Sequence, residues 1–445
     1  MEPAPELPTL WEASRVWLRI GLLSFGGPAG QIAMLHREIV ETRHWLGERR
    51  FLHALSFCTL LPGPEAQQLA TYLGWAMHGP VGGVLAGGLF VLPGAAVLLA
   101  LSMVYAVLGR LLAVDGLFFG LKCAVLAIVV QALLRIGGRA LKTRQAWLLA
   151  AAAFFAIYAL ALPFPLVIAA AAFVGLGAPH WFRGALHGAD VPDGPGLLER
   201  LLAADPDRLP RQAAAARRAA AIAAALWLTP VAALNVFAPG RFADIARFFS
   251  KMAVVTFGGA YAVLAYVAQD AVHAYGWLRP QEMLAGLGLA ETTPGPLVLV
   301  LQFVGFLAGY RAPGALHGVA GGIVASLLTL WVTFAPCFTF VFLGAPLVEQ
   351  LAENRRLAAS LGAVTAAVVG VIANLALWFG LHVLFAATFT WHAGPAGLEL
   401  PQPLTIQPLA AALAIAAALL LFALRQNVPR TLAVTAALGL LARMT

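Results

Sequence analysis

The sequence predicts an all-α integral membrane protein with roughly 10–13 transmembrane helices in two homologous halves. Hydrophobic residues make up 61% of the 445 residues and charged residues 11%, against about 45–50% and about 25% in soluble domains. A soluble core cannot bury that share of apolar surface. Apolar stretches of about 20 residues, enough to cross a bilayer, recur along the whole chain. The third observation is an internal repeat.

Three strings built on glycine, proline and tryptophan recur 232 positions later in the chain. Phe25-Gly26-Gly27 returns as Phe257-Gly258-Gly259, Trp45-Leu46 as Trp277-Leu278, and Pro62-Gly63-Pro64 as Pro294-Gly295-Pro296. Glycine and proline at fixed positions serve the backbone rather than general hydrophobicity. In a membrane protein, a duplicated unit is typical of transporters built from two pseudo-symmetric halves.

The predicted helices follow one another as apolar stretches separated by short polar segments. In the first half they lie near 14–35, 52–77, 81–108, 111–134 and 146–178, the last being a hairpin bent at 163–165. In the second half they lie near 219–238, 245–269, 283–309, 314–347, 358–388, 405–424 and 430–443.

The polar segments divide the chain into three parts. Residues 1–178 form the N-terminal repeat, 179–218 an arginine-rich linker, and 219–445 the C-terminal repeat. Because basic segments remain on the cytoplasmic side, the linker is predicted to be cytoplasmic. The segment from Thr390 to Pro403 contains no arginine or lysine, which favours an external loop.

Matched loops of the two halves differ in charge. The loop after the first Phe-Gly-Gly contains Arg37, Arg43, Arg49 and Arg50, whereas its partner contains only Arg279. The positive-inside rule therefore favours inverted repeats. Three unbroken spans would separate the first of these loops from the next basic loop, 139–144, and place the two on opposite sides. We therefore expect one broken segment to be re-entrant.

The glycine and proline breaks are the predicted binding site. A break inside the bilayer exposes backbone groups that protein, water or ligand must satisfy. Half-helices starting at such breaks direct their positive N-terminal ends at an anion. The glycines concerned are Gly26, Gly27 and Gly63 in the first half, and Gly258, Gly259 and Gly295 in the second. The alternative is that they serve only close helix packing and kinks.

A cation precedes each Phe-Gly-Gly by six residues: Arg19 in the first half and Lys251 in the second. A buried cation in a membrane helix normally has a partner or a function, so we predict that both bind substrate. The alternative is that they extend to the membrane surface. Four uncharged side chains join the predicted substrate-binding set as hydrogen-bond donors: Ser24, Thr256, Gln31 and Gln67.

Two acids lie beside the Pro-Gly-Pro strings. Glu65 follows the first directly, and Glu291 precedes the second by three residues. An acid near a break can relay protons, so both are predicted to carry the coupling proton. Each can equally cap a half-helix or pair with Arg19 or Lys251.

The sequence argues against several other classes of function. We expect no catalytic residues, because no His, Asp and Glu cluster converges on a nucleophile. We expect no metal or cofactor, since the three cysteines, Cys58, Cys123 and Cys337, are scattered within apolar runs. Nucleic-acid binding is not expected either, because the basic residues flank spans rather than forming one face.

The strings SFGGPAGQIAML, LLPGPEAQQLATYLGW, KMAVVTFGGAYAVLAYV and LAETTPGPLVLVLQFVGFLAG resemble the paired signatures of the chromate ion transporter family in its long, two-domain form. The resemblance implies a multi-pass plasma-membrane carrier that exports chromate and confers chromate resistance, driven by the proton-motive force. The absence of a Walker motif agrees with that energy source. Sulfate, also a tetrahedral dianion, fits the same site. A passive channel, an uptake carrier for sulfate-like oxyanions and a homodimer stay open.

Overall fold

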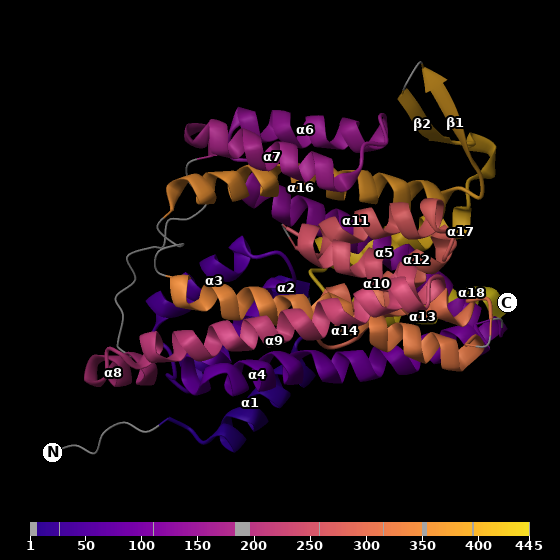
Figure 1. The fold of residues 1–445 in the computed structure, drawn as a ribbon. Coiled ribbons are helices and arrows are strands. Elements are labelled where there is room, and N and C mark those ends of the chain that lie inside the picture. Colours follow the sequence, from indigo (N-terminus) through magenta and orange to yellow (C-terminus); the bar gives the residue numbers. More distant parts are fainter. Residues whose placement is uncertain are drawn as a thin grey trace.

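Each half of the chain begins with two pairs of helices, and a glycine or proline break separates the two helices of each pair (Figure 1). The computed structural model describes residues 7–25, 27–109, 111–182, 196–257, 259–314, 316–348, 354–393 and 396–444. Gly26 and Gly258 lie outside these described residues. The helices of the first half, with η marking short 3₁₀ or π turns, are α1 (Leu10–Leu23), α2 (Gly27–His36), η1 (Arg37–Thr42), α3 (Glu48–Leu60), α4 (Glu65–Leu108), α5 (Leu112–Ala140), α6 (Arg144–Tyr158), α7 (Phe164–Gly177) and η2 (Pro179–Phe182).

The second half repeats this order after two intervening helices, α8 (Leu197–Ala204) and α9 (Arg208–Phe237). Its elements are α10 (Arg241–Val255), α11 (Ala260–Gln269), η3 (Asp270–Ala274), α12 (Pro280–Thr292), η4 (Leu297–Leu299), α13 (Val300–Tyr310), α14 (Gly318–Gly344), η5 (Ala345–Leu347), α16 (Arg355–Leu384), β1 (Thr388–Ala393), β2 (Ala396–Pro401), η6 (Pro403–Thr405), α17 (Pro408–Ala418), η7 (Leu419–Ala423) and α18 (Val428–Met444). Helix α9 begins inside the segment predicted as linker, so the 218/219 boundary falls within one helix.

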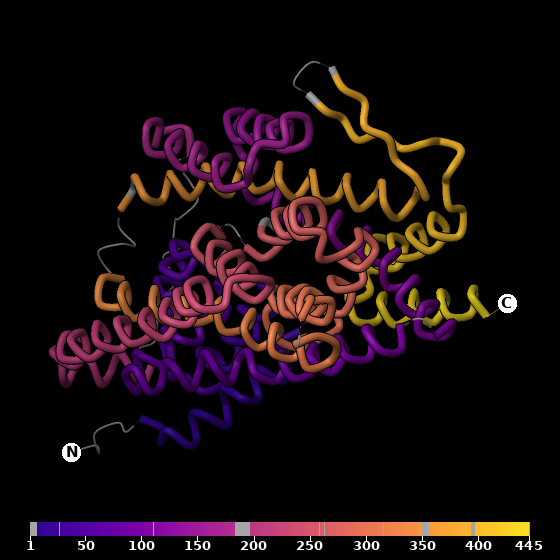
Figure 2. Tube along the Cα trace, turned by 45° about the vertical axis from the view of Figure 1, so that its right-hand side comes forward, coloured from indigo at the N-terminus to yellow at the C-terminus, as the bar shows by residue number. Residues whose placement is uncertain are grey.

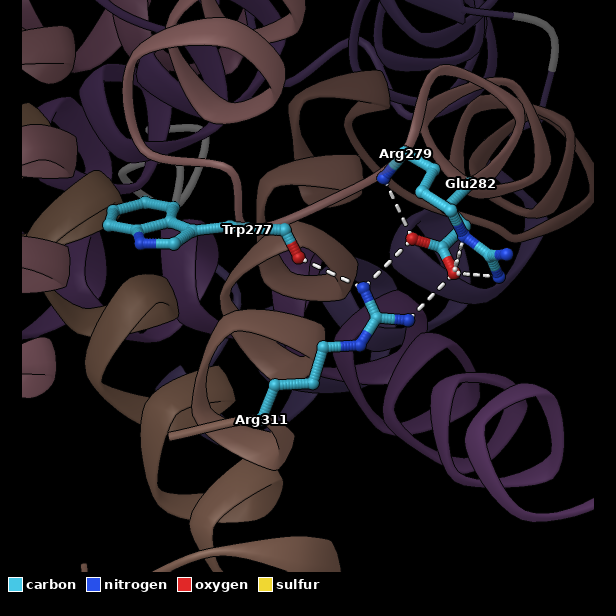
Figure 3. Close-up of polar contacts among 4 residues, drawn as sticks. All are labelled: Trp277, Arg279, Glu282 and Arg311. Carbon is cyan, nitrogen blue, oxygen red and sulfur yellow. Dashed lines mark hydrogen bonds and ion pairs between the residues drawn. The ribbon is translucent and has the colours of Figure 1, made fainter. Parts of the chain in front are cut away.

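Helices α12 and α13 form a re-entrant hairpin in the second half. The turn between them contains Pro294-Gly295-Pro296, where proline removes backbone donors and Gly295 has a φ of 94°. Arg311, after α13, donates from Nη1 to the Trp277 carbonyl at 3.0 Å and pairs with Glu282 in the first turn of α12 (Figure 3). Both ends of the hairpin therefore lie on the same side.

Helix α3 and the first part of α4 form the matching hairpin. Helix α4 is interrupted at His78 and Gly79, where Gly79 has a φ of 64°. Arg208 donates to the Met77 carbonyl at 3.1 Å, and nearby Glu199 accepts from the Gly47 amide at 3.0 Å. Because the linker contacts both ends, this hairpin also returns to the side from which it entered.

The re-entrant segment explains the charge pattern of the loops. After the first hairpin, only two unbroken crossings, 80–108 and α5, separate the Arg37–Arg50 loop from the Arg139–Arg144 loop. Both basic loops therefore lie at one end of the molecule, together with α8, at the left of Figure 1. The predicted re-entrant helices and the two-half architecture are confirmed.

Among the residues that the structure describes, five helices, α4, α5, α9, α14 with η5, and α16, are long and apolar enough to cross a membrane. Four shorter apolar segments, at residues 144–158, 164–177, 297–310 and 408–423, accompany them. The sequence count of spans is higher because the stretches near 14–35 and 245–269 are each divided by a break into two short helices. Only three residues of α9 are buried, as expected for a helix facing lipid.

The last helix pair of each half packs on the long helix of the other half. Figures 1 and 2 show α6 and α7 beside α16, and α17 and α18 lie against α5. Glycines allow this approach, since a Cβ added at Gly120 would lie 2.0 Å from the Thr435 carbonyl oxygen. A Cβ at Gly370 would lie equally close to the Ala150 oxygen. Small residues thus hold the halves together.

A β-hairpin interrupts the otherwise helical chain where the sequence suggested an external loop. Strands β1 and β2 pair antiparallel, with Thr390 opposite Glu399. Residues 388–391, Thr-Phe-Thr-Trp, are β-branched or aromatic and favour a strand over a helix. The hairpin lies at the end of the molecule opposite α8 (Figure 1).

Candidate functional site

The breaks of the two halves are hydrogen-bonded to each other. The Gly63 amide donates to the Thr256 carbonyl at 2.9 Å, and the Gly295 amide donates to the Ser24 carbonyl at 2.8 Å. Both donors and both acceptors are related by the 232-residue repeat. The two bonds therefore flank a pseudo-twofold axis, as expected for inverted repeats.

A cavity of about 640 Å³ lies on this axis. Its walls include four pairs of matched positions, in which the first member comes from the first half: Gly27 and Gly259, Pro28 and Ala260, Ala29 and Tyr261, and Thr59 and Glu291. Residues at the basic end of the molecule, such as Lys142, Thr143 and Trp181, also line it. The cavity therefore extends from the breaks towards that end.

Two helices begin at the cavity wall. Helix α2 starts at Gly27, with a φ of 71°, and α11 is capped by Gly259, with a φ of 96°. A Cβ added at either position would meet nothing within 4 Å, so the left-handed backbone rather than crowding requires glycine. The first N–H groups of a helix have no intrahelical partner and carry a partial positive charge. Both helix starts can therefore attract an anion.

Three cations on α5 and the loop after it line the same cavity: Arg135, Arg139 and Lys142. Arg135 and Arg139 are four residues apart and therefore lie on one face of α5, and Lys142 follows in the loop after the helix. All three side chains are exposed, and none forms a hydrogen bond or ion pair with a described residue. These three cations were not among the predicted substrate-binding residues, because the basic segment 139–144 was used only to assign orientation. The four-residue spacing of Arg135 and Arg139 was the pattern in the sequence that could have indicated them.

Both predicted acids line the cavity. Glu65 starts α4 directly after the first Pro-Gly-Pro and is half-buried. Glu291 lies at the end of α12, is only 4% exposed, and accepts a 2.7 Å hydrogen bond from the Tyr261 hydroxyl. Tyr261 lies in the first turn of α11, so this bond joins two of the breaks.

Arg19 and Lys251 lie outside the cavity. Both side chains are exposed, while the buried face of α1 contains Val16, Trp17 and Ile20. Lys251 Nζ lies 5.8 Å from the centre of the Tyr266 ring. This placement fits the alternative of a cation extending to the membrane surface.

The other predicted ligands hold the breaks in place behind the cavity. The Ser24 and Thr256 hydroxyls donate to carbonyls of their own helices, those of Ile20 and Met252. Gln31 Nε2 donates to the Gly295 carbonyl at 2.5 Å. Gln67 Nε2 donates to Thr71, and its buried Oε1 has no hydrogen-bond partner among the described residues. None of these four side chains lines the main cavity.

Within the described residues, no group of three or more His, Cys, Asp or Glu side chains could hold a metal ion. The arrangement is instead two helix starts and three cations around a shared space, with two acids in the wall. Such a site can bind a multivalent oxyanion through charge-assisted hydrogen bonds.

Residues 11–176 and 243–442 match the family described as Chromate transporter. A chromate transport protein of Pseudomonas aeruginosa is 35% identical over 80% of this chain and 77% of its own length. A probable chromate transport protein of Synechococcus elongatus is 28% identical, covering 89% and 93%. A chromate transport protein of Cupriavidus metallidurans is 28% identical, over 82% of this chain and 81% of its own length. No solved structure matches the chain. Because both halves of the chain match this family and the chain is 35% identical to a chromate transport protein over most of its length, this protein belongs to the chromate transporter family.

Proposed function

We propose that the protein exports chromate across the plasma membrane as a secondary active transporter driven by the proton-motive force. The observation that carries the proposal is the cavity at the repeat interface, where two helix starts and three cations without an ion-pair partner among the described residues line one space. The relatives named as chromate transport proteins support the choice of substrate.

The site suits a tetrahedral dianion. Arginine offers several N–H donors in a planar fork and binds oxyanions in a bidentate manner. Arg135 lies nearest the breaks along α5, and Arg139 and Lys142 follow towards the basic end. The rise of an α-helix spaces Arg135 and Arg139 by about 6 Å along α5, so the cations can pass an anion from the mouth to the breaks.

The accessible side of the cavity supports export. The lining residues Lys142, Thr143 and Trp181 lie at the end that carries the basic loops and α8, the end that the positive-inside rule assigns to the cytoplasm. A cavity open to that side is ready to load cytoplasmic substrate. An inside-negative potential then favours outward movement of negative charge by roughly 2.3 kcal/mol per charge and 100 mV.

The experiment is chromate flux in proteoliposomes of the purified full-length protein. With the membrane potential held at zero and a pH difference imposed, we expect chromate to accumulate against its own gradient, which a channel does not do under these conditions. Sulfate should compete if the site recognises tetrahedral dianions in general. Flux that only dissipates a chromate gradient would indicate a passive channel. No flux above protein-free vesicles would exclude chromate as the substrate.

A further inference from the structure

The two acids of the cavity are not equivalent. Glu291 replaces Thr59 of the first half, and its partner Tyr261 replaces Ala29. The ionisable pair is therefore present on one side of the pseudo-twofold axis only. The Tyr261 hydroxyl donates to Glu291 Oε1 at 2.7 Å, which leaves Oε2 to carry a proton.

Arg135 lines the same cavity as this pair. It makes no hydrogen bond or ion pair with any described residue, yet its charge acts on both the Glu291 carboxyl group and the Tyr261 hydroxyl group. A cation in this position has two available counter-ions: the Glu291 carboxylate and a bound oxyanion. Both compete for the same positive charge.

We propose that Arg135 is shared between Glu291 and the oxyanion, so that Glu291 takes up a proton when the dianion binds and the two cross the membrane together. With the dianion on Arg135, a charged Glu291 would face a like charge without a counter-ion, which a low-dielectric site penalises. With the cavity empty, the carboxylate can take Arg135 instead. Linkage is reciprocal, so the proton must also strengthen binding of the dianion.

The other charged groups around α12 do not offer the same exchange. Glu65, Arg139 and Lys142 line the same cavity, but Arg135 is the cavity cation whose charge acts on both Glu291 and Tyr261. Tyr105, Lys122 and Arg311 act on Glu282, in the first turn of the helix. Arg443 on α18 pairs with Asp115. Arg135 is thus the cation that Glu291 and a bound oxyanion can share.

The inference rests on the proposed transport of chromate and specifies its coupling. A dianion moving with one proton transfers one net negative charge. The electrical part of the proton-motive force then drives export, while the pH difference opposes it. An antiporter would show the opposite dependence on pH, which makes the sign of the pH effect decisive.

The test uses proteoliposomes of the full-length protein, with valinomycin and equal potassium to hold the potential at zero. A pH difference of one unit should accumulate chromate about tenfold on the alkaline side, as one-to-one symport requires. Accumulation on the acidic side, or none, would overturn the inference while leaving chromate transport itself established. A wild-type protein that moves no chromate would instead contradict the proposed function.

Variants of Glu291 and Arg135 distinguish proton coupling from binding of chromate. Glu291→Gln should move chromate without protons, losing the tenfold accumulation and transferring two charges per chromate instead of one. Arg135→Gln should raise the half-saturating chromate concentration at least tenfold, and Arg135→Lys should recover part of that loss. Arg144→Gln removes an exposed arginine that does not line the cavity and should match wild type. Unchanged proton coupling in Glu291→Gln would show that Glu291 is not the coupling acid.

Discussion

Glu199 holds the first re-entrant hairpin in the way that Glu282 holds the second. The Glu199 carboxylate accepts from the Gly47 amide at 3.0 Å, and the Glu282 carboxylate accepts from the Arg279 amide at 2.8 Å. Gly47 and Arg279 are matched by the repeat. Each acid also pairs with an arginine, Glu199 with Arg50 at 3.2 Å. Arg50 occupies the position that matches Glu282. In the first pair the arginine is therefore on the hairpin and the acid on the linker, whereas in the second the acid Glu282 is on the hairpin itself.

The tryptophan carbonyls before the two hairpins repeat the relationship. The Trp45 carbonyl accepts from the Leu198 amide of α8 at 3.0 Å, whereas the Trp277 carbonyl accepts from Arg311 at the same distance. The second hairpin, α12–α13, is therefore closed by its own ends (Figure 3). The first hairpin is closed by the linker helix α8.

Glu282→Gln should destabilise the protein strongly. Glu282 is 2% exposed and accepts from both guanidinium nitrogens of Arg311, at 2.9 and 2.7 Å. Breaking one partner of a buried pair costs about 3–5 kcal/mol. Thermal unfolding of the detergent-solubilised protein measures the loss. Asp244→Asn, which breaks the exposed pair with Arg247, is the control and should cost about 0–1 kcal/mol.

The same clamp should withstand acid. Glu282 lies in the first turn of α12, outside the helices that are long enough to cross the membrane. Burial alone would raise the pKa of Glu282, but hydrogen bonds from Arg311 and Arg279 outweigh it and hold the pKa to about 2. Because this folded-state pKa lies below the usual value of about 4.3, the stabilisation is present above that value and is lost as pH falls towards 2. Melting temperatures of wild type and Glu282→Gln should therefore converge only in that acid range.

Inverted repeats require matched loops on opposite sides of the membrane. Cysteines placed at Glu41 and His273, both exposed, should react with an impermeant reagent from opposite sides. A cysteine at Arg144 should share the side of Glu41, because the first hairpin is re-entrant. The native cysteines are buried and should give little background. Labelling of Glu41→Cys and His273→Cys from one side would mean parallel repeats.

The breaks were predictable because glycine and proline have few reasons to recur inside apolar helices. The same residues located Glu65 and Glu291, which are adjacent to breaks in sequence and line the cavity. Arg19 and Lys251 were selected by repeat symmetry, but symmetry relates lipid-facing positions as well as buried ones. The neighbours of Arg19, Leu18 and Leu22, are 40% and 50% exposed, which sequence spacing from Phe25 alone does not reveal.

Arg135 and Arg139 were not predicted because the cavity depends on packing between distant helices. Their wall is formed by α5 of the first half, and the facing wall includes Leu361 and Thr365 of α16. No local pattern in the sequence states that these helices leave a space between them. The contact between α5 and α17–α18 of the other half is equally non-local.

Substitution of the cations that line the cavity should have a different effect from substitution of Arg19 and Lys251, which do not line it. Arg139→Gln should weaken chromate binding by about 1.5–3 kcal/mol, the usual range for a hydrogen bond to a charged group. Arg19→Gln and Lys251→Gln should keep the wild-type chromate affinity, since both side chains are exposed and neither lines the cavity. Half-saturating chromate concentrations in proteoliposomes measure the difference. Loss of transport in Arg19→Gln at normal membrane expression would restore the sequence-based assignment.

The glycines at the two helix starts should be sensitive to substitution through backbone strain alone. Gly27 and Gly259 have positive φ values, and a Cβ at either position would meet no other atom within 4 Å. Alanine there should cost roughly 1–2 kcal/mol and should displace the N–H groups that face the cavity. We expect a raised half-saturating chromate concentration with a nearly normal melting temperature. Gly120→Ala is the matched contrast, since its Cβ would lie 2.0 Å from the Thr435 oxygen; it should lower the melting temperature by separating α5 from α18. If Gly27→Ala leaves chromate affinity unchanged, the start of α2 does not bind the anion.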